Sequence, residues 1–286
     1  MGFFTNHYDK PGPGVDPDAP QKRSFFRFFE ILSRKFWKIG QVNLIYSIVL
    51  IPIFLLLMIA STTVVGNIAE VFGMSDEESM SAALLVGGLI FTNLFIAAWG
   101  AGPVTAGISY IMRNYSREEH AWVWTDFKDE AKSNFKQATI VLVIDLIMIF
   151  VFNAALSFYS GAEGTLGILK YVVWAIMLVY TLMHFYIYPI MVTFDLPLKD
   201  IYKNSLIFAM GKLPSNLFVL IVLMAIHIGL PVCTILFCGK QMPIIMVIIY
   251  LLELAFLQGF SSYLVNFNVY PKLKKYMLDV IEDKKE

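Results

Sequence analysis

Six long apolar stretches divide this chain, and the charged residues gather between them. A helix needs about 20 apolar residues to cross the roughly 30 Å of hydrocarbon in a bilayer, and each stretch meets that length. Because lipid offers backbone groups no hydrogen-bond partner, a helix is the expected structure of each stretch. The sequence therefore predicts an all-α membrane protein, a six-helix transmembrane bundle with spans near 43–65, 82–112, 138–158, 168–194, 215–237 and 244–268.

The composition agrees with lipid as the solvent of these helices. Hydrophobic residues make up 58% of the 286 residues and charged residues 15%, with a mean hydropathy of +0.67. A soluble domain carries about 25% charged residues, so this chain has too few to cover a water-facing surface. The formal net charge is zero. The chain therefore lacks the basic excess that is typical of a protein that binds nucleic acid. The expected partner is the lipid bilayer.

Lysine and arginine fall almost entirely on one side of the predicted spans. They lie before span 1, between spans 2 and 3, between spans 4 and 5, and after span 6, and only Lys170 and Lys240 lie elsewhere. Positive charge is retained on cytoplasmic loops. We therefore predict a multi-pass protein of the cell membrane with both termini in the cytoplasm and an acidic first outer loop.

The ends of the chain differ from its middle. Residues 1–22 are rich in proline and predict a flexible cytoplasmic tail, 23–275 form the transmembrane domain, and 276–286 form a charged cytoplasmic tail. The first apolar run begins near Asn43, too late for a cleavable signal peptide. Cys233 and Cys238 lie five residues apart on one predicted helix, where they are poorly placed to bond, and both are expected to be buried.

Span 2 is too long for one straight crossing. Its 82–112 range would reach about 46 Å as a helix. Pro103 lacks a backbone N–H, so we expect it to kink this helix, and Pro189 is placed to do the same in span 4.

Amphipathic segments are predicted on the cytoplasmic face. In residues 23–38 the aromatic and aliphatic side chains share one face and the cations lie opposite, which is typical of a helix in the membrane interface. These anchors are Phe25, Phe29, Leu32 and Phe36 on the apolar face, and Arg23, Arg27, Arg34 and Lys38 on the basic face. The segment is interpreted either as an elbow that anchors span 1 or as a lipid-sensing or partner-docking helix.

Two further segments repeat this pattern. One lies between spans 2 and 3, where Trp122 and Trp124 suit the membrane–water boundary, and the other runs from about Pro197 to Met210. Together the three segments suggest a platform at which a membrane transporter or signalling partner docks, or simply three elbows.

A weak internal repeat relates spans 2–3 to spans 4–5. Spans 3 and 5 open on Ser133-Asn134 and Ser215-Asn216, and an ionisable residue follows each asparagine by 11 positions, Asp145 and His227. Both copies cross the membrane in the same sense, which predicts a parallel repeat.

Four ionisable residues fall inside the predicted spans: Asp145, His184, His227 and Glu253. Charge is costly in a bilayer, so such residues are candidates for function. Depths counted at about 1.5 Å per residue match Asp145 with His184, and His227 with Glu253. We predict that each pair meets if its spans are neighbours. A carboxylate beside an imidazole can relay protons or bind a cation, or it can simply hold two helices together.

Tyr180 and Tyr188 flank His184 on one stripe of span 4. This stripe is interpreted either as a surface that stacks a sugar ring or another planar ligand, or as a packed aromatic seam.

Four short motifs carry a family resemblance. They are Phe25-Phe26-Arg27-Phe28-Phe29; Gly102-Pro103-Val104-Thr105-Ala106 with Arg113; Asn134-Phe135-Lys136-Gln137-Ala138; and Tyr188-Pro189 followed by Asp200-Ile201-Tyr202-Lys203-Asn204-Ser205. As a set they look like the YesL-like family of bacterial integral membrane proteins, over roughly residues 22–275. The proline-rich tail and the acidic first outer loop depart from the family. The resemblance implies a domain of unknown function and, through members encoded near carbohydrate transporter and sensor genes, a link to sugar uptake. It supplies no catalytic or binding residues.

These observations bear on three functions. An accessory or regulatory protein linked to carbohydrate uptake predicts a closed interior and an exposed patch at the inner face. A small solute transporter or channel predicts a polar cavity that reaches the intramembrane residues. An enzyme is not expected, because the sequence shows no phosphate-binding glycine loop, metal-binding helix or serine elbow. No cofactor or metal site is expected either.

Overall fold

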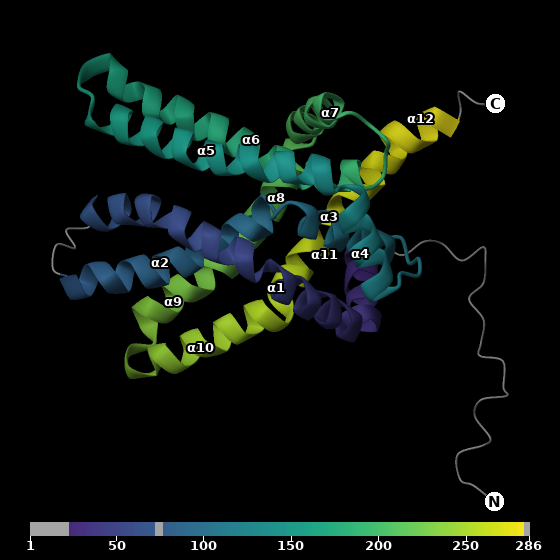
Figure 1. Ribbon diagram of the computed structural model, residues 1–286, viewed down its shortest axis with the longest axis horizontal. Helices are drawn as coiled ribbons and strands as arrows, with labels where there is room; N and C mark the ends of the chain where they lie inside the picture. Colours follow the sequence, from purple (N-terminus) through teal and green to yellow (C-terminus); the bar gives the residue numbers. More distant parts are fainter. Residues whose placement is uncertain (1–22, 72–76, 283–286) are drawn as a thin grey trace, which may run out of the picture.

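The computed structural model describes residues 23–71 and 77–282, and this part of the chain forms helices and no strand. The predicted tail 1–22 lies outside these ranges. The helices are α1 Ser24–Val71, α2 Glu77–Ala98, α3 Pro103–Ser116, α4 Val123–Ser133, α5 Phe135–Gly161, α6 Leu169–Met191, α7 Leu198–Gly211, α8 Leu213–Met224, α9 Leu230–Phe237, α10 Met242–Leu252, α11 Gln258–Leu273 and α12 Asp279–Glu282 (Figure 1).

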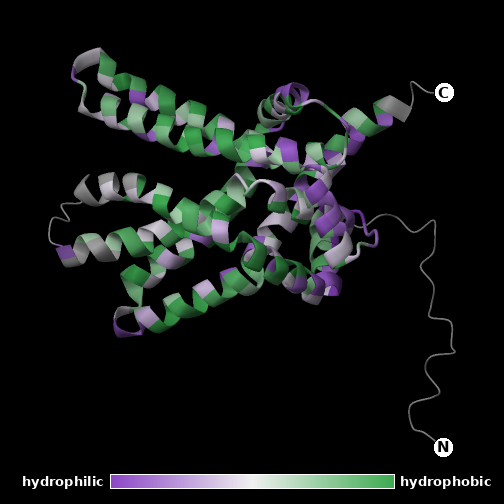
Figure 2. Ribbon diagram, viewed as in Figure 1, coloured by the Kyte–Doolittle hydropathy of each residue, from purple (hydrophilic) through white to green (hydrophobic). Residues whose placement is uncertain are grey.

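Among the described residues, five helical segments are long and apolar enough to cross a membrane: Ser24–Gly66, Phe135–Gly161, Gly164–Met191, Leu213–Phe237 and Gly239–Leu278. The bent pair of α2 and α3 makes up to six if it counts as one span. Hydrophobic residues run along the hairpins, and hydrophilic ones gather at one end of the molecule (Figure 2). These apolar helices make the chain a multi-pass membrane protein.

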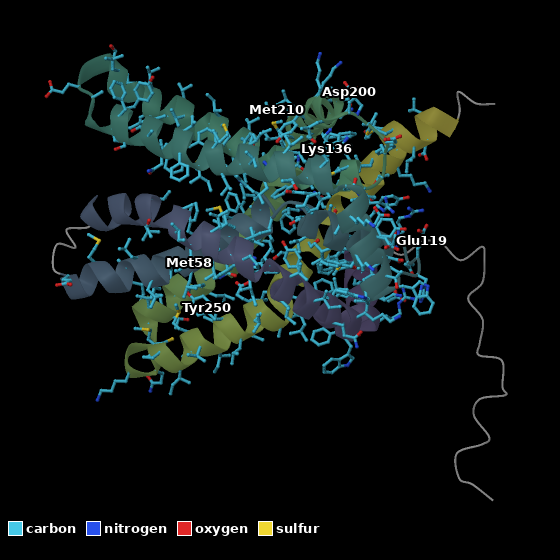
Figure 3. The ribbon with its side chains drawn as sticks, in the orientation of Figure 1. Met58, Glu119, Lys136, Asp200, Met210 and Tyr250 are labelled. Carbon is cyan, nitrogen blue, oxygen red and sulfur yellow. The ribbon has the colours of Figure 1, made fainter. Side chains whose placement is uncertain are left out.

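The two ends of the bundle differ. Helices α3, α4 and α12 and the beginning of α1 lie together at one end, and the turns of the α5–α6 and α9–α10 hairpins lie at the other (Figure 1). Glu119, Lys136 and Asp200 are found toward the first end, while Met58 and Tyr250 lie among the hairpins (Figure 3). We call the first the basic end, because the loops predicted to hold the lysines and arginines are there.

The core lies where α3 meets the second half of α6. Most of α3 is buried, and so is every residue of Leu182–Met191, whereas the first half of α6 buries only Val173. Helix α11 packs on α3 from the other side. The hairpins beyond this core leave large apolar side chains exposed, as expected of surface that faces lipid.

Helix α1 runs without interruption through the predicted interfacial helix 23–38 and span 1. The predicted apolar face packs on the bundle only in part, through Leu32 and through the Phe36 ring, which lies 4.6 Å from that of Phe256. Ile31 and Ile39 are fully buried, while Phe25, Phe29 and Phe36 are exposed. Much of the predicted apolar face is therefore available to lipid, and a neighbouring face holds α1 to the bundle.

The bend in span 2 has a different cause from the predicted proline kink. Helix α2 ends at Ala98, α3 begins at Pro103, and the two axes differ by 56°. Gly100 and Gly102 between them have φ of 87° and 66°, in the left-handed region that favours glycine. Pro103 is the first residue of α3, where a missing N–H costs nothing, so the glycines break the helix and the proline starts the next one. Pro189 likewise kinks no long helix, since α6 ends two residues later at Met191.

The two other amphipathic segments form short helices where predicted, as α4 and α7. The repeated asparagines have related roles. Asn134 donates to the Glu130 carbonyl at the end of α4, and Asn216 donates to the Phe208 and Ala209 carbonyls near the end of α7. Each satisfies backbone oxygens that a helix end leaves without a partner.

The last two spans contain π-helical turns. Ala225–Gly229 joins α8 to α9, Glu253–Leu257 joins α10 to α11, and Lys274–Leu278 joins α11 to α12. The chain is therefore helical through Glu282, into the predicted charged tail. Both cysteines are free, but the expectation that they are buried is wrong, because Cys233 is exposed and Cys238 is half-buried. Both lie on the outer part of a hairpin that faces away from the core.

Candidate functional site

The first polar cluster joins α5 to α6 inside the bundle. Asp145 is fully buried, and its Oδ1 lies 3.0 Å from Nε2 of His184. The hydroxyl of Tyr180 donates to the same Oδ1 at 2.8 Å. The sequence prediction that Asp145 and His184 meet is confirmed. Their function as ligand-lining groups stays a prediction.

The partners of His184 define its protonation. Its Nδ1 lies 3.0 Å from the carbonyl oxygen of Trp99, which can only accept, so Nδ1 carries a hydrogen. Without a further proton, the Nε2 lone pair would face the negative Oδ1 of Asp145 at 3.0 Å. The two atoms are close but are not aligned for a hydrogen bond, so a proton on Nε2 would make the contact a buried ion pair with a net charge of zero. Neutrality suits a low-dielectric interior.

Trp99 and the break between helices α2 and α3 support this cluster. The Trp99 indole stacks on the imidazole of His184, with centroids 5.3 Å apart and planes 7° from parallel, and donates to Thr181. The hydroxyl of Tyr188 accepts the N–H of Gly102 at 3.0 Å. The Tyr180–Tyr188 stripe is thus packed against the break between α2 and α3, in agreement with the aromatic-seam interpretation.

The second cluster joins two π-helical turns. His227 lies in Ala225–Gly229 and Glu253 in Glu253–Leu257, and Nδ1 of the imidazole is 2.7 Å from Oε1 of the carboxylate. Both residues are buried. This predicted contact is also confirmed. π-Helical turns widen a helix locally and occur often at functional sites.

The same proton argument applies here. The Ser261 hydroxyl donates to the Leu257 carbonyl, so it accepts from Nε2 of His227, 2.9 Å away. Nε2 therefore carries a hydrogen, and the contact between Nδ1 and Oε1 needs one more proton on either atom. Gln258 contacts the second oxygen of Glu253 at 3.3 Å and donates to the Asn93 carbonyl at 3.0 Å.

Asn43 of α1 satisfies the backbone around the Glu253 turn. Its amide donates to the carbonyls of Glu253 and Leu254 at 3.0 and 2.7 Å, and its oxygen accepts the N–H of Gly259. A π-helical turn leaves backbone groups without their usual partners, and one buried amide supplies three bonds. α1 is thereby tied to the element that holds Glu253.

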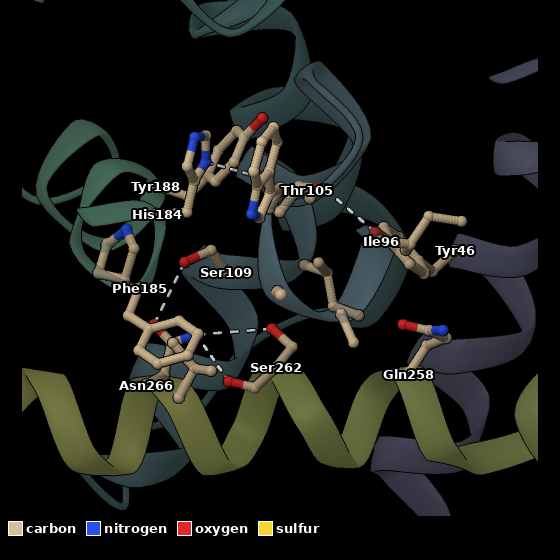
Figure 4. A pocket seen from close by; sticks show the side chains of 17 residues that line it. Tyr46, Ile96, Thr105, Ser109, His184, Phe185, Tyr188, Gln258, Ser262 and Asn266 are labelled. Carbon is tan, nitrogen blue, oxygen red and sulfur yellow. Dashed lines mark hydrogen bonds between the residues drawn. The ribbon is translucent and has the colours of Figure 1, made fainter. Parts of the chain in front are cut away.

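A cavity of about 40 Å³ lies between the two clusters. His184 and Tyr188 line one side, Ser109 and Asn266 another, and Gln258 joins the cavity to the second cluster (Figure 4). The volume suits about two or three water molecules, and a few polar groups on its mostly apolar wall offer them partners. His184 of the first pair and Gln258, which contacts the second pair, therefore line the same small chamber.

The predicted basic anchors make contacts at the basic end. Arg27 and Arg34 both bind Glu118, which follows α3 and has a φ of 64°. The hydrogen bond from Arg34 lowers the pKa of Glu118, and Arg27 acts in the same direction, while partial burial opposes them. Arg23, Trp122 and Trp124 are exposed. Anchoring to lipid stays a prediction for all of them.

Several residues of these clusters were not expected from sequence. The Trp99 carbonyl contacts His184, the Asn43 amide contacts the backbone of Glu253, and the Gln258 amide contacts the side chain of Glu253. Each is an isolated polar or aromatic residue within an apolar stretch of the sequence. That isolation is the sequence feature that could have marked it as a buried contact residue. Arg113 was also missed as a structural residue. It is buried and donates to the carbonyl of Val192 at 2.6 Å, which closes the end of α6.

Neither pair forms a metal centre by itself. Within the described residues, no group of three or more histidine, cysteine, aspartate or glutamate side chains is placed to hold a metal ion. Each pair offers one imidazole and one carboxylate, and the chemistry it can perform is to hold or transfer a proton.

Comparison with known proteins gives one match. A family model described as a protein of unknown function, DUF624, matches residues 84–155. The segment includes the break between α2 and α3, together with Trp99 and Asp145 of the first cluster. The YesL-like resemblance is consistent with this match. No curated protein and no solved structure matches the chain.

Proposed function

We propose that the chain is an accessory or regulatory component of the cell membrane that engages a transporter or signalling partner through its basic end. In this proposal α2 and α3 together make one of six spans, and the basic end and both termini are cytoplasmic. The partition of lysine and arginine supports the orientation.

One observation carries the accessory role: the cavity at the centre of the bundle is too small for a nutrient. Sites for small molecules measure about 300–1,000 Å³, and the chamber beside His184 measures about 40 Å³. By contrast, Phe25, Trp122 and Trp124 are exposed at the basic end. A surface is offered there, while the chamber beside His184 offers space for water alone. The larger pocket of about 430 Å³ that reaches Glu253 is lined mostly by apolar side chains of α1, α2 and α10.

The link to carbohydrate uptake rests on the YesL-like resemblance. We propose that the partner belongs to a sugar-uptake system, and two assays separate an accessory from a carrier. In cells that lack the chain, uptake of a labelled sugar panel should fall and be restored by the wild-type protein. The W122A/W124A variant should restore it poorly, and a matched F158A variant at the other end should restore it fully.

Purified protein provides the decisive control. Liposomes that contain this chain alone should take up none of the sugars. Sugar uptake by those liposomes, or full restoration by W122A/W124A, would rule out the accessory role.

A second function is favoured by the two proton-holding pairs. A small transporter or channel that moves protons or a small cation would use Asp145, His184, His227 and Glu253, and the chamber beside His184 would carry water between the pairs. Liposomes loaded with a pH-sensitive dye test this. A pH gradient should decay faster with wild-type protein than with empty liposomes, and E253Q should slow it. Identical decay with and without the protein excludes this function.

A further inference from the structure

A groove of about 1,140 Å³ opens along one side of the bundle at the basic end. The beginning of α1, helix α8, and helix α11 with the turn after it form its walls. The chemistry of these walls changes along α11, from apolar at depth to basic at the end of the bundle.

The deep part of the groove is apolar. Side chains from α8 and α11 line it, and they are half-buried except for the exposed Phe218; they are Phe218, Val222, Phe260, Leu264 and Phe267. Phe28 of α1 closes this part, and its ring lies 5.2 Å from that of Phe267. Aromatic and aliphatic walls of this kind suit a hydrocarbon chain.

The mouth of the groove is basic. Five cations line it against two carboxylates: Arg27, Arg117, Lys272, Lys274 and Lys275 against Glu119 and Asp279.

Most of these cations already have partners. Arg27 binds Glu118, Arg117 binds Glu119, and Lys272 donates to Ser215. Lys274 and Lys275 are exposed, and within the described part of the chain neither forms an ion pair with a carboxylate. The two lysines therefore leave positive charge at the mouth for a ligand.

The length of the groove matches one leaflet. Phe260 and Lys274 are 14 residues apart on continuous helix, which corresponds to about 21 Å. Half of a bilayer's hydrocarbon measures about 15 Å, and the headgroup layer lies beyond it. A ligand that fills the groove must therefore be apolar over most of its length and anionic at one end.

We propose that this groove binds one anionic phospholipid, with its phosphate at Lys274 and Lys275 and an acyl chain along Phe218, Val222 and Leu264. The polarity of the groove, its net positive mouth and its length all correspond to that ligand. The proposal is independent of the partner at the basic end and of proton transfer in the interior.

Native mass spectrometry of the detergent-purified protein tests the proposal. The probes are phosphatidylglycerol and phosphatidylcholine with identical acyl chains. Wild-type protein should bind one phosphatidylglycerol at least about tenfold more tightly than phosphatidylcholine, since each basic residue near the headgroup adds several-fold to the affinity. K274E/K275E should remove this preference. The K128E/K132E control, which reverses two exposed lysines on α4, should retain it.

A second variant tests the acyl part separately. V222W should fill the deep groove, leave the lysines in place and weaken phosphatidylglycerol binding about tenfold or more, with an unchanged melting temperature as the folding control. Three results would overturn the proposal: equal binding of both lipids by wild-type protein, retained preference in K274E/K275E, or unchanged binding by V222W. Competition by inorganic phosphate at millimolar concentration would also overturn it, because the site would then recognise a free anion.

Discussion

At the scale of single residues, the two buried pairs are informative because their other hydrogen bonds fix one nitrogen of each imidazole. The Trp99 carbonyl and the Ser261 hydroxyl each require an N–H on the ring. In the second pair the remaining nitrogen must share a proton with Glu253, whereas Nε2 of His184 lies 3.0 Å from Asp145 without hydrogen-bond alignment. A pair that is neutral as a whole is tolerated inside the bundle.

Substitution at Asp145 distinguishes a hydrogen-bond acceptor from a required charge. D145N should lose less stability than D145A, because its amide oxygen can still accept from Tyr180 at the position of Oδ1, although that oxygen cannot also donate to Nε2 of His184. D145A leaves both partners buried and unsatisfied, which should cost about 1–3 kcal/mol. Thermal unfolding in one detergent measures both. Equal destabilisation by the two variants would show that the negative charge itself is needed.

Glu118 gives a pH dependence outside the spans. Arg34 holds the pKa of Glu118 below its ordinary value of 4.5. The stabilisation from Glu118 is therefore fully present above pH 4.5 and is lost as the pH falls through the lower pKa of the folded protein. At pH 7, E118Q should be less stable than wild type by at most about 1 kcal/mol, because the side chain is 39% exposed.

The difference between wild type and E118Q should shrink as the pH is lowered from 7 to below 4.5. Unfolding midpoints at several pH values measure it. D129N, an exposed carboxylate on α4, is the matched control and should show no such trend. A gap between wild type and E118Q that widens toward low pH would contradict the assignment.

At the scale of elements, breaks in the helices matter more than the helices themselves. The break between α2 and α3 frees the Trp99 carbonyl for His184 and the Gly102 N–H for Tyr188. The π-helical turns bring His227 and Glu253 together. His227 and Glu253 therefore lie where regular hydrogen bonding is interrupted, and His184 contacts such an interruption from the regular helix α6.

Gly100 tests the importance of the first break. A Cβ at this position would lie 2.6 Å from the Tyr188 ring and 2.8 Å from Thr105, on a backbone with φ of 87°. G100A should therefore lower stability by at least about 1–3 kcal/mol, from strain and displacement of Tyr188. G161A is the control, because nothing lies within 4 Å of its Cβ, and it should be neutral. Unfolding temperatures compare the two, and equal values would contradict the packing described for the break.

At the scale of the whole molecule, one end differs from the other in charge, packing and irregularity. The core, the groove, and the exposed Trp122 and Trp124 belong to the basic end, while the apolar hairpins extend away from it (Figure 2). This division suggests that the hairpins serve as anchors and that recognition takes place at the basic end.

The orientation can be tested by labelling single cysteines in intact cells. In a C233S/C238S background, K240C should react with a membrane-impermeant maleimide added outside. K128C on α4 should react only after the cells are permeabilised. The positive-inside distribution is the reason for this expectation. Labelling of K128C in sealed cells would reverse the proposed topology.

Local properties of the chain were readable from the sequence. Hydrophobic length and helical periodicity predicted the helical class, most of the spans, α4 and α7, because these depend on neighbouring residues alone. Depth along the spans was enough to match Asp145 with His184 and His227 with Glu253. The break at Gly100, the π-helical turns, and the contacts of Trp99, Asn43 and Gln258 depend on which helices touch and at what height. These contacts follow from the packing of segments that are distant in the sequence, which periodicity along one helix does not encode. The small chamber and the basic groove are lined by several such segments, so only the tertiary structure determines them.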